Sequence, residues 1–234
     1  ERALYKSELM MLEMLANANW ERPIYMAITV GSENHLGMGN HFMQEGLAYR
    51  FTPFDTDKLD SKIDSEKMYD NLMNKFKFGG IDKPGIYIDE NVMRMCYTHR
   101  RIFTQLVGQL IKEGKKDKAL AALDYAEKMI PSYNVPYDWA NGAFQMAEYQ
   151  LGQNEKANKI IDELANKSLE YMIWYLSLND NQLAIAGENF VYNASLLDAE
   201  VRLMEKYKSE ELAKHYSTQL DQLYNEYVTR MKGK

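Results

Sequence analysis

Apolar side chains recur at helical spacing along residues 101–131, and this stretch is the clearest pattern in the chain. In its first half, Phe103, Leu106 and Leu110 lie three and four positions apart, which predicts one apolar stripe on a helix. Gly114 lies in the polar segment that follows, and glycine suits the left-handed backbone that often ends a helix. The first half therefore predicts a helix that ends at a tight turn.

The second half of this stretch predicts a partner helix. Asp117 is the expected N-cap, and Pro131 is expected to stop the helix. Four apolar residues form its stripe: Ala119, Leu123, Ala126 and Ile130. Because two of these side chains are small alanines, we expect the two helices to approach closely and form a hairpin.

The same pattern recurs further along the chain. Residues 136–151 and 155–171 predict two helices joined at Gly152, which lies 38 positions after Gly114. The spacing predicts a third pair over residues 190–204 and 212–227, with a joint that contains no glycine. We expect the intervening segment, 172–187, to be extra and loop-like in its second part. The chain is therefore predicted to contain three helical pairs.

The first hairpin resembles a tetratricopeptide repeat in its second helix and departs from it in the first. Val107 and Leu110 stand where that family has its glycine and tyrosine. Six residues match the family's pattern: Phe103, Leu106, Ala119, Leu123, Ala126 and Pro131. The resemblance implies a mainly α fold, an α-α superhelix of tetratricopeptide-like helical hairpins with a small mixed α+β N-terminal part. A plain helical hairpin with no tie to the family is the alternative, because helical period alone does not identify a repeat.

The N-terminal part mixes helical and extended patterns. We expect a helix over residues 1–19, a buried strand over 24–30, a second strand over 47–51 and a helix over 67–78. Asp89 is the expected N-cap of the helix that leads into the first hairpin. These patterns predict two domains: residues 1–89, a mixed α/β part with two short strands, and residues 90–234, the helical repeat region.

Composition narrows the function classes. The chain has 234 residues, 46% of them hydrophobic and 26% charged, which suits a globular protein with a buried core. A net charge of −6 argues against a nucleic-acid surface, since such surfaces are basic. No apolar run reaches the roughly 18 residues that a membrane helix needs. Because the chain begins at Glu1 and is already in a helical pattern, we expect it to be a piece of a longer protein.

No residue pattern predicts catalysis, a metal or a cofactor. The four histidines are scattered without metal-ligand spacing, and no nucleophile-elbow motif is present. The aspartates of residues 55–64 lack the glycine and final glutamate of a calcium loop, so we expect a solvated loop there. Cys96 is the single cysteine, and we expect a buried structural thiol. We therefore expect that the chain is not an enzyme and holds no cofactor.

Two groups of side chains have two interpretations each. The basic cluster of residues 99–101 either pairs with neighbouring acids on a helix face or binds an acidic segment or phosphate. Tyr171, Trp174 and Tyr175 either fill the gap between the second and third helical pairs or stack on sugar rings. In both cases the first, structural interpretation is the expected one.

Four N-terminal segments carry a second resemblance: 19–25, 45–50, 68–73 and 87–91. In this order and together with the helical repeats, they resemble the C-terminal part of large bacterial multi-pass membrane proteins. The membrane part of those proteins looks like a protein O-mannosyltransferase-type glycosyltransferase. The resemblance implies a non-catalytic soluble domain on the periplasmic side of the inner membrane, because the family's catalytic acid lies in the membrane part.

The shape of a stacked-repeat domain predicts a binding surface, because the first helix of each pair usually lines a concave side. The polar positions expected on that side are Arg101, Thr104, Asn141 and Gln145. We expect them to be exposed and to bind a protein or peptide partner, or the membrane part of the same chain. The competing interpretation is that this surface packs against residues 1–90 of the chain itself. The alternative is a stand-alone helical-repeat scaffold for protein interactions, unrelated to glycosylation.

Overall fold

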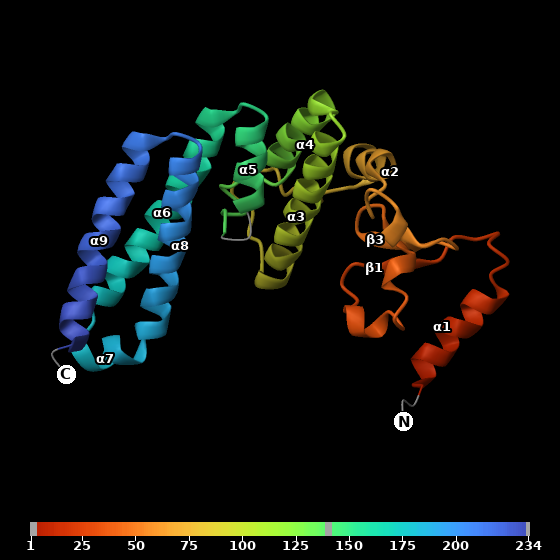
Figure 1. Ribbon diagram of the computed structural model, residues 1–234, viewed down its shortest axis with the longest axis horizontal. Helices are drawn as coiled ribbons and strands as arrows, with labels where there is room; N and C mark the ends of the chain where they lie inside the picture. Colours follow the sequence, from red (N-terminus) through yellow and green to blue (C-terminus); the bar gives the residue numbers. More distant parts are fainter. Residues whose placement is uncertain (1–3, 139–141, 233–234) are drawn as a thin grey trace. The chain divides into compact units, whose positions relative to one another are not determined.

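The computed structural model describes residues 4–138 and 142–232, and it is mainly helical with a small β-sheet near the N-terminus (Figure 1). This confirms the predicted mainly α class with a small mixed N-terminal part. By its internal contacts the chain divides into two compact units, Glu1–Asn134 and Val135–Lys234. The predicted division at residue 90 separates repeat from non-repeat sequence rather than contact units, and it stays a prediction. Each unit is described by itself.

The first unit contains a three-stranded antiparallel sheet: β1 (Tyr25–Ala27), β2 (Phe42–Gln44) and β3 (Ala48–Phe51), in the order β1-β3-β2. The register pairs Met26 with Tyr49 and Met43 with Arg50. β3 confirms the strand predicted at residues 47–51. Extended chain was also predicted at 24–30, but β1 has only three residues because the chain turns back at once, with the Val30 N–H donating to the Ala27 carbonyl (3.0 Å).

Two further differences concern burial in this sheet. The predicted strand at 24–30 was expected to be buried, yet Tyr25 and Ala27, which share one face of β1, are exposed. β2 was not predicted, although all three of its residues are buried. Its sequence, Phe-Met-Gln, is too short to show an alternating pattern, and only pairing with β3 makes it a strand.

Helix α1 (Lys6–Asn17) forms where residues 1–19 predicted a helix. The Glu8 carboxylate accepts a hydrogen bond from the Tyr5 backbone N–H (2.6 Å), which satisfies one of the free donors at the helix start. The helix is followed by two residues in the left-handed region, Asn19 and Trp20, at φ 46° and 59°. No residue of α1 is buried, so this helix contributes little to the core of its unit.

Helix α2 (Ser65–Asp70) continues directly as a wider π turn over Asn71–Lys75. This confirms the predicted helix at residues 67–78 in most of its length, with a start two residues earlier and an end at Lys75, three residues earlier. The Asp64 carboxylate caps it by accepting from the Lys67 N–H (3.1 Å). Met68 and Leu72 are fully buried and anchor the helix to its unit.

The predicted hairpin is present as α3 (Glu90–Lys112) and α4 (Lys116–Met129). Asp89 caps α3 as predicted, accepting from Asn91 N–H (2.8 Å) and Val92 N–H (3.2 Å). Gly114 has φ 74°, which confirms the left-handed turn. The prediction for Asp117 is wrong: Lys115 is the N-cap residue, and Asp117 lies inside the first turn. The predicted stripes are fully buried: Phe103, Leu106, Leu110, Ala119 and Leu123.

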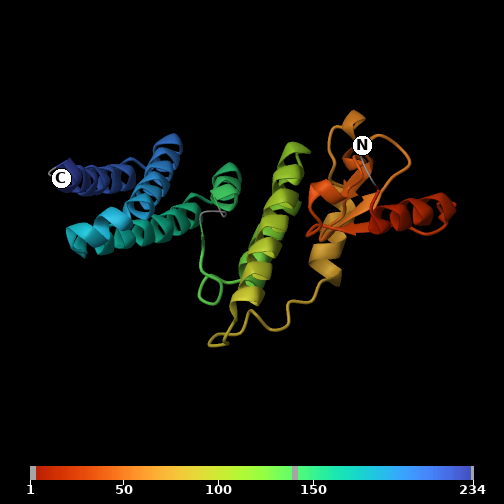
Figure 2. The same ribbon diagram turned by 90° about the horizontal axis from the view of Figure 1, so that it is seen from below.

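The second unit contains only helices among its described residues: α5 (Gly142–Gln150), α6 (Asn154–Ser177), α7 (Asp180–Ile185), α8 (Gly187–Lys206) and α9 (Glu210–Lys232). Helices α6, α8 and α9 pack against one another around one apolar core (Figure 2). Gly152, at φ 78°, makes the predicted turn between α5 and α6. The third predicted pair is α8 and α9, and Lys208 takes the left-handed position (φ 62°) at the joint that lacks glycine.

The segment 172–187 differs from its prediction as a loop-like insertion. Helix α6 runs on to Ser177, and α7 begins at Asp180 because Asn179 and Gln182 form a reciprocal cap. Tyr171 and Trp174 were expected to fill a gap in the core, but they are 46% and 54% exposed. The helical pairs are confirmed as pairs, whereas the predicted superhelix depends on how the two units are placed and stays a prediction.

Candidate functional site

The residues predicted to bind a partner do not share one environment. Arg101 is exposed on α3. Thr104 is half-buried, and its hydroxyl donates to the Arg100 carbonyl of its own helix (3.0 Å). Gln145 on α5 is completely buried, so the prediction that it is exposed is wrong. Asn141 lies outside the described residues. A role of these residues in binding stays a prediction.

The burial of Gln145 has a simple physical cause. The sequence of α5 carries two apolar stripes, and the binding prediction relied on the one that contains Ala143 and Met146. In the structure the other stripe, with Phe144 and Ala147, faces the core, and Ala143 is exposed. Gln145 follows Phe144 in the sequence, so the orientation of α5 that points Phe144 into the core also brings Gln145 to the buried side of the helix.

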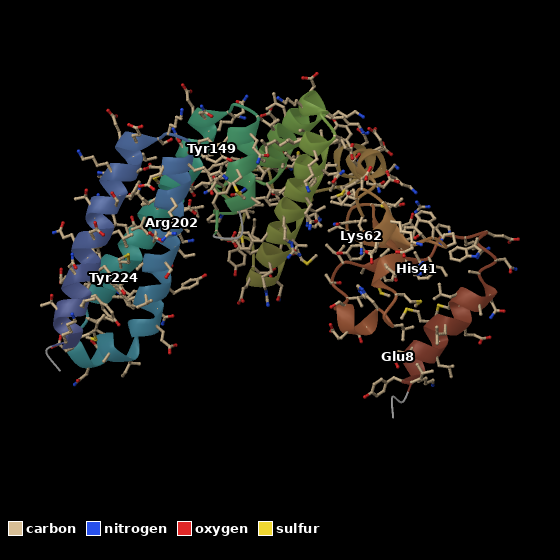
Figure 3. All side chains as sticks on the ribbon, in the orientation of Figure 1. Glu8, His41, Lys62, Tyr149, Arg202 and Tyr224 are labelled. Atoms are coloured by element: carbon tan, nitrogen blue, oxygen red, sulfur yellow. The ribbon has the colours of Figure 1, made fainter. Side chains whose placement is uncertain are left out.

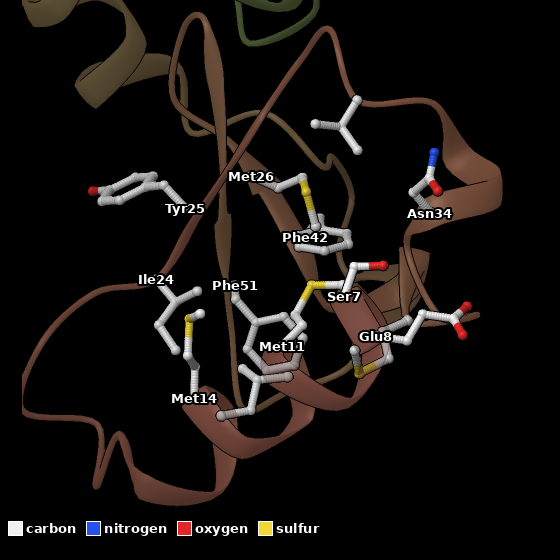
Figure 4. Close-up of a pocket in the computed structure, with 13 residues that line it drawn as sticks. Ser7, Glu8, Met11, Met14, Ile24, Tyr25, Met26, Asn34, Phe42 and Phe51 are labelled. Atoms are coloured by element: carbon white, nitrogen blue, oxygen red, sulfur yellow. The ribbon is translucent and has the colours of Figure 1, made fainter. Parts of the chain in front are cut away.

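One concave feature of the first unit is an apolar groove between α1 and the sheet, with a volume of about 410 Å³ (Figure 4). Figure 4 shows Met11 of α1 and Phe51 of β3 converging on it from opposite sides. Most of the side chains that line it are apolar, and four of them are methionines: Met11, Met14, Met26 and Met38. Apolar concave surfaces of this size are typical of ligand and peptide sites.

The floor of the groove is held by aromatic contacts. Phe42 and Phe51 meet edge to face with ring centroids 5.6 Å apart, and Trp20 stacks on Phe51 at 5.8 Å. His35 meets the Phe42 ring at 5.0 Å, and its Nε2 is 3.2 Å from the Val30 carbonyl oxygen. The methionines, by contrast, are unbranched and adapt to different shapes. The groove therefore combines a fixed aromatic floor with adaptable walls.

The charge of the groove is low. Glu8 is the one charged side chain among the described residues that line it, and it also caps its own helix (Figure 3). The Tyr25 hydroxyl points away from the groove and donates to the Glu45 carboxylate (2.9 Å) (Figure 4). Burial, followed by this hydrogen bond, raises the pKa of Tyr25. Glu45 is itself buried and paired with Arg50 (2.5 Å) and Lys67 (3.1 Å), so this polar cluster is structural.

The outer surface of α1 is apolar as well. Four apolar side chains on α1 or just before it are more than half exposed and do not line the groove: Leu4, Tyr5, Leu9 and Met10. A helix whose apolar surface is this wide normally packs against other elements on more than one side. Exposed apolar area of this kind marks interaction surfaces in folded proteins. This helix therefore offers apolar side chains both to the groove and to its surroundings.

The side chains that line the groove are mostly apolar and offer contacts for binding. In the part of the chain that the structure describes, no group of three or more His, Cys, Asp or Glu side chains is placed to hold a metal ion. Cys96 is 2% exposed, as predicted for a structural thiol, and burial raises the pKa of its thiol. Sequence reasoning missed the groove, although one signal was present: apolar residues cover the helix at residues 6–17 on all but one side, where Lys6, Glu13 and Asn17 lie.

Comparison with known proteins places this groove in a recognised segment. Residues 1–68 match the model of a family described as TMEM260-associated domain 2. This part of the chain therefore fits a domain of a TMEM260-like membrane protein. All side chains that line the groove lie within the matched residues. No curated protein and no solved structure matches the chain. Among the described helices, none is both long and apolar enough to cross a membrane.

Proposed function

We propose that the chain is a non-catalytic binding domain of a membrane-associated protein, and that the groove beside α1 holds an apolar segment of a protein partner. One observation carries this proposal: an open, methionine-lined groove of about 410 Å³ in the segment that matches TMEM260-associated domain 2. Methionine-rich surfaces suit partners of variable sequence because their side chains repack.

The chemistry of the partner follows from the lining. Nearly all of the groove surface is apolar, and its one charged side chain is a carboxylate, Glu8. The segment that fits best is an amphipathic helix that inserts aliphatic side chains and carries basic residues near Glu8. Such a segment would come from an acceptor protein or from another part of the membrane protein to which this domain belongs.

The wider setting is part of the same proposal. The resemblance to O-mannosyltransferase-type membrane proteins supports an extracytoplasmic domain that positions a protein partner near a glycosyltransferase-like membrane part. The helical hairpins support a tetratricopeptide-like superhelix as the scaffold. The alternative function is a stand-alone interaction scaffold, and the groove serves binding in either case.

Two neighbouring methionines give a matched test. Met11 lines the groove, whereas Met10 of the same helix is 51% exposed and does not line it. A helical peptide built from leucine and lysine is titrated into wild type, Met11→Glu and Met10→Glu, with the fluorescence of Trp20 beside Phe51 as one readout. We expect Met11→Glu to weaken binding about tenfold or more, because it places a charge in an apolar contact, and Met10→Glu to bind as wild type does.

A third variant distinguishes the loss of a groove contact from the detachment of α1 from the sheet. Met38→Glu changes the groove from the loop side and leaves α1 unchanged. If Met38→Glu and Met11→Glu both bind as wild type does, the groove is not the binding site. If Met10→Glu alone loses binding, the outer face of α1 is the site and the proposal for the groove is wrong.

A further inference from the structure

The second unit contains a small polar pocket that is independent of the groove. It lies between α6 and α8 and has a volume of about 220 Å³. Its wall includes Ser168 and Asn193, which are 6% and 9% exposed, and the partly buried Glu200. Several polar side chains that converge on a small pocket are the usual mark of a site for a small ligand.

Glu200 is the unusual member of this group. Its Oε2 atom is buried and has no hydrogen-bond partner among the described residues. Gln145, completely buried on α5, faces the carboxyl group, but neither of its amide atoms forms a hydrogen bond of standard geometry. A buried polar group without a partner is costly and requires an explanation. A carboxylate in such surroundings is stabilised by a cation placed beside it.

The mouth of the pocket is aromatic. Tyr171 on α6 and Tyr192 on α8 both line it and are 46% and 50% exposed. Leu164 and Leu196 complete the apolar part of the wall. The faces of tyrosine rings attract cations, and ammonium groups are bound in this way in many proteins. The pocket therefore combines a carboxylate on its wall with two tyrosines at its entrance.

We propose that this pocket binds a small molecule through a primary ammonium group, which pairs with Glu200 and lies between the rings of Tyr171 and Tyr192. Ser168 and Asn193, which also line the pocket, offer a hydroxyl group and an amide oxygen to the remaining N–H donors of the ligand. Leu164 and Leu196 contact its carbon chain. The proposal does not depend on the function of the groove.

The electrostatics of Glu200 agree with this geometry. Burial raises the pKa of Glu200 to about 7, against the weaker opposing effect of Gln145. Other charged or titratable groups lie around the site: Tyr149 of α5 (Figure 3), Asp138 and Lys167. Lys167 is exposed, so it stays in water at the rim and does not neutralise the carboxylate. An ammonium ligand supplies the missing positive charge.

The proposal is tested with n-butylammonium, which has the proposed head group, and with n-butanol, which has the same carbon chain and no charge. Each is titrated into the whole chain while amide NMR shifts of α6 and α8 are followed. We expect n-butylammonium to shift amides around Tyr171, Tyr192 and Glu200, and n-butanol to leave them unchanged. Equal shifts with both compounds, or shifts only outside the pocket, would overturn the proposal.

Two variants and the pH dependence sharpen this test. Glu200→Gln keeps the shape of the side chain and removes its charge, and we expect it to weaken n-butylammonium binding about tenfold or more. Glu205→Gln, exposed on the same helix, is the control and should bind as wild type does. Because the carboxyl group must be ionised, wild type should bind more tightly at about pH 8.5 than at about pH 5.5. Unchanged binding by Glu200→Gln, or no pH dependence, would remove Glu200 from the site.

Discussion

The buried carboxyl group of Glu200 predicts a contribution that lowers the stability of the protein as the pH rises from about 4.5 to 7, and replacing Glu200 by glutamine should remove this contribution. Burial raises the pKa of Glu200 from the ordinary 4.5 to about 7. Below about pH 4.5 the group is protonated in both the folded and the unfolded chain and costs nothing. Between about pH 4.5 and 7 the unfolded chain loses its proton first, so the free energy of unfolding falls. Above about pH 7 the full cost is present.

The size of this cost follows from the two pKa values. Their difference, about 7 minus 4.5, at 1.36 kcal/mol for each pKa unit, corresponds to about 3 kcal/mol. Glutamine has the same shape and carries no charge, so Glu200→Gln should be more stable than wild type above about pH 7. The expected gain is of the order of 1–3 kcal/mol, since partial relaxation of the site around the charge reduces the full value. Near about pH 4.5 the two proteins should be almost equally stable.

Urea unfolding at a series of pH values between about 4.5 and 8.5 measures this difference. Glu205→Gln, at an exposed position on α8, controls for the loss of one negative charge and should change stability little at any pH. A stability difference between Glu200→Gln and wild type that is constant across this pH range would refute the reasoning. A loss of stability in Glu200→Gln above about pH 7 would show that the charge is compensated in the folded protein.

Two further predictions concern the helical hairpin of the first unit. Gly114→Val should lower the free energy of unfolding by about 1 kcal/mol or more, because a β-branched residue resists φ 74°; thermal melting measures this, and an unchanged midpoint would contradict it. Gly108→Val, inside α3 and with open space around its Cα, is the comparison for the volume change alone. If the exposed Arg101 contributes to partner binding, Arg101→Ala should weaken the binding of acidic peptides to the chain, and equal affinity in a calorimetric titration would exclude it.

The hairpin shows how much of this protein its sequence predicts. Its helices follow from the spacing of apolar residues, and its turn follows from one glycine that reaches the left-handed region. The cap at Asp89 is equally local, because the carboxylate bonds to N–H groups two and three residues ahead. Each of these features involves residues within one or two turns of each other. Such features are determined by residues that are close to one another in the sequence.

The candidate sites were not predictable in the same way. The groove needs residues of α1 beside Phe42 and Phe51, and β2 is a strand only because β3 pairs with it. Neither relation leaves a periodic signal in the sequence. The wide apolar surface of α1 is typical of a helix that packs against other elements, but it does not show which elements these are.

Helix α5 shows a property that the local sequence does not determine: which side of the helix faces the core depends on packing. Its two apolar stripes both satisfy the helical period, so the sequence allowed either to face the core. Packing of α5 on α6 selected the stripe with Phe144 and buried Gln145 opposite Glu200. The helix itself was determined locally, but its rotation, and with it the surroundings of Glu200, depends on the shape of the surface it meets.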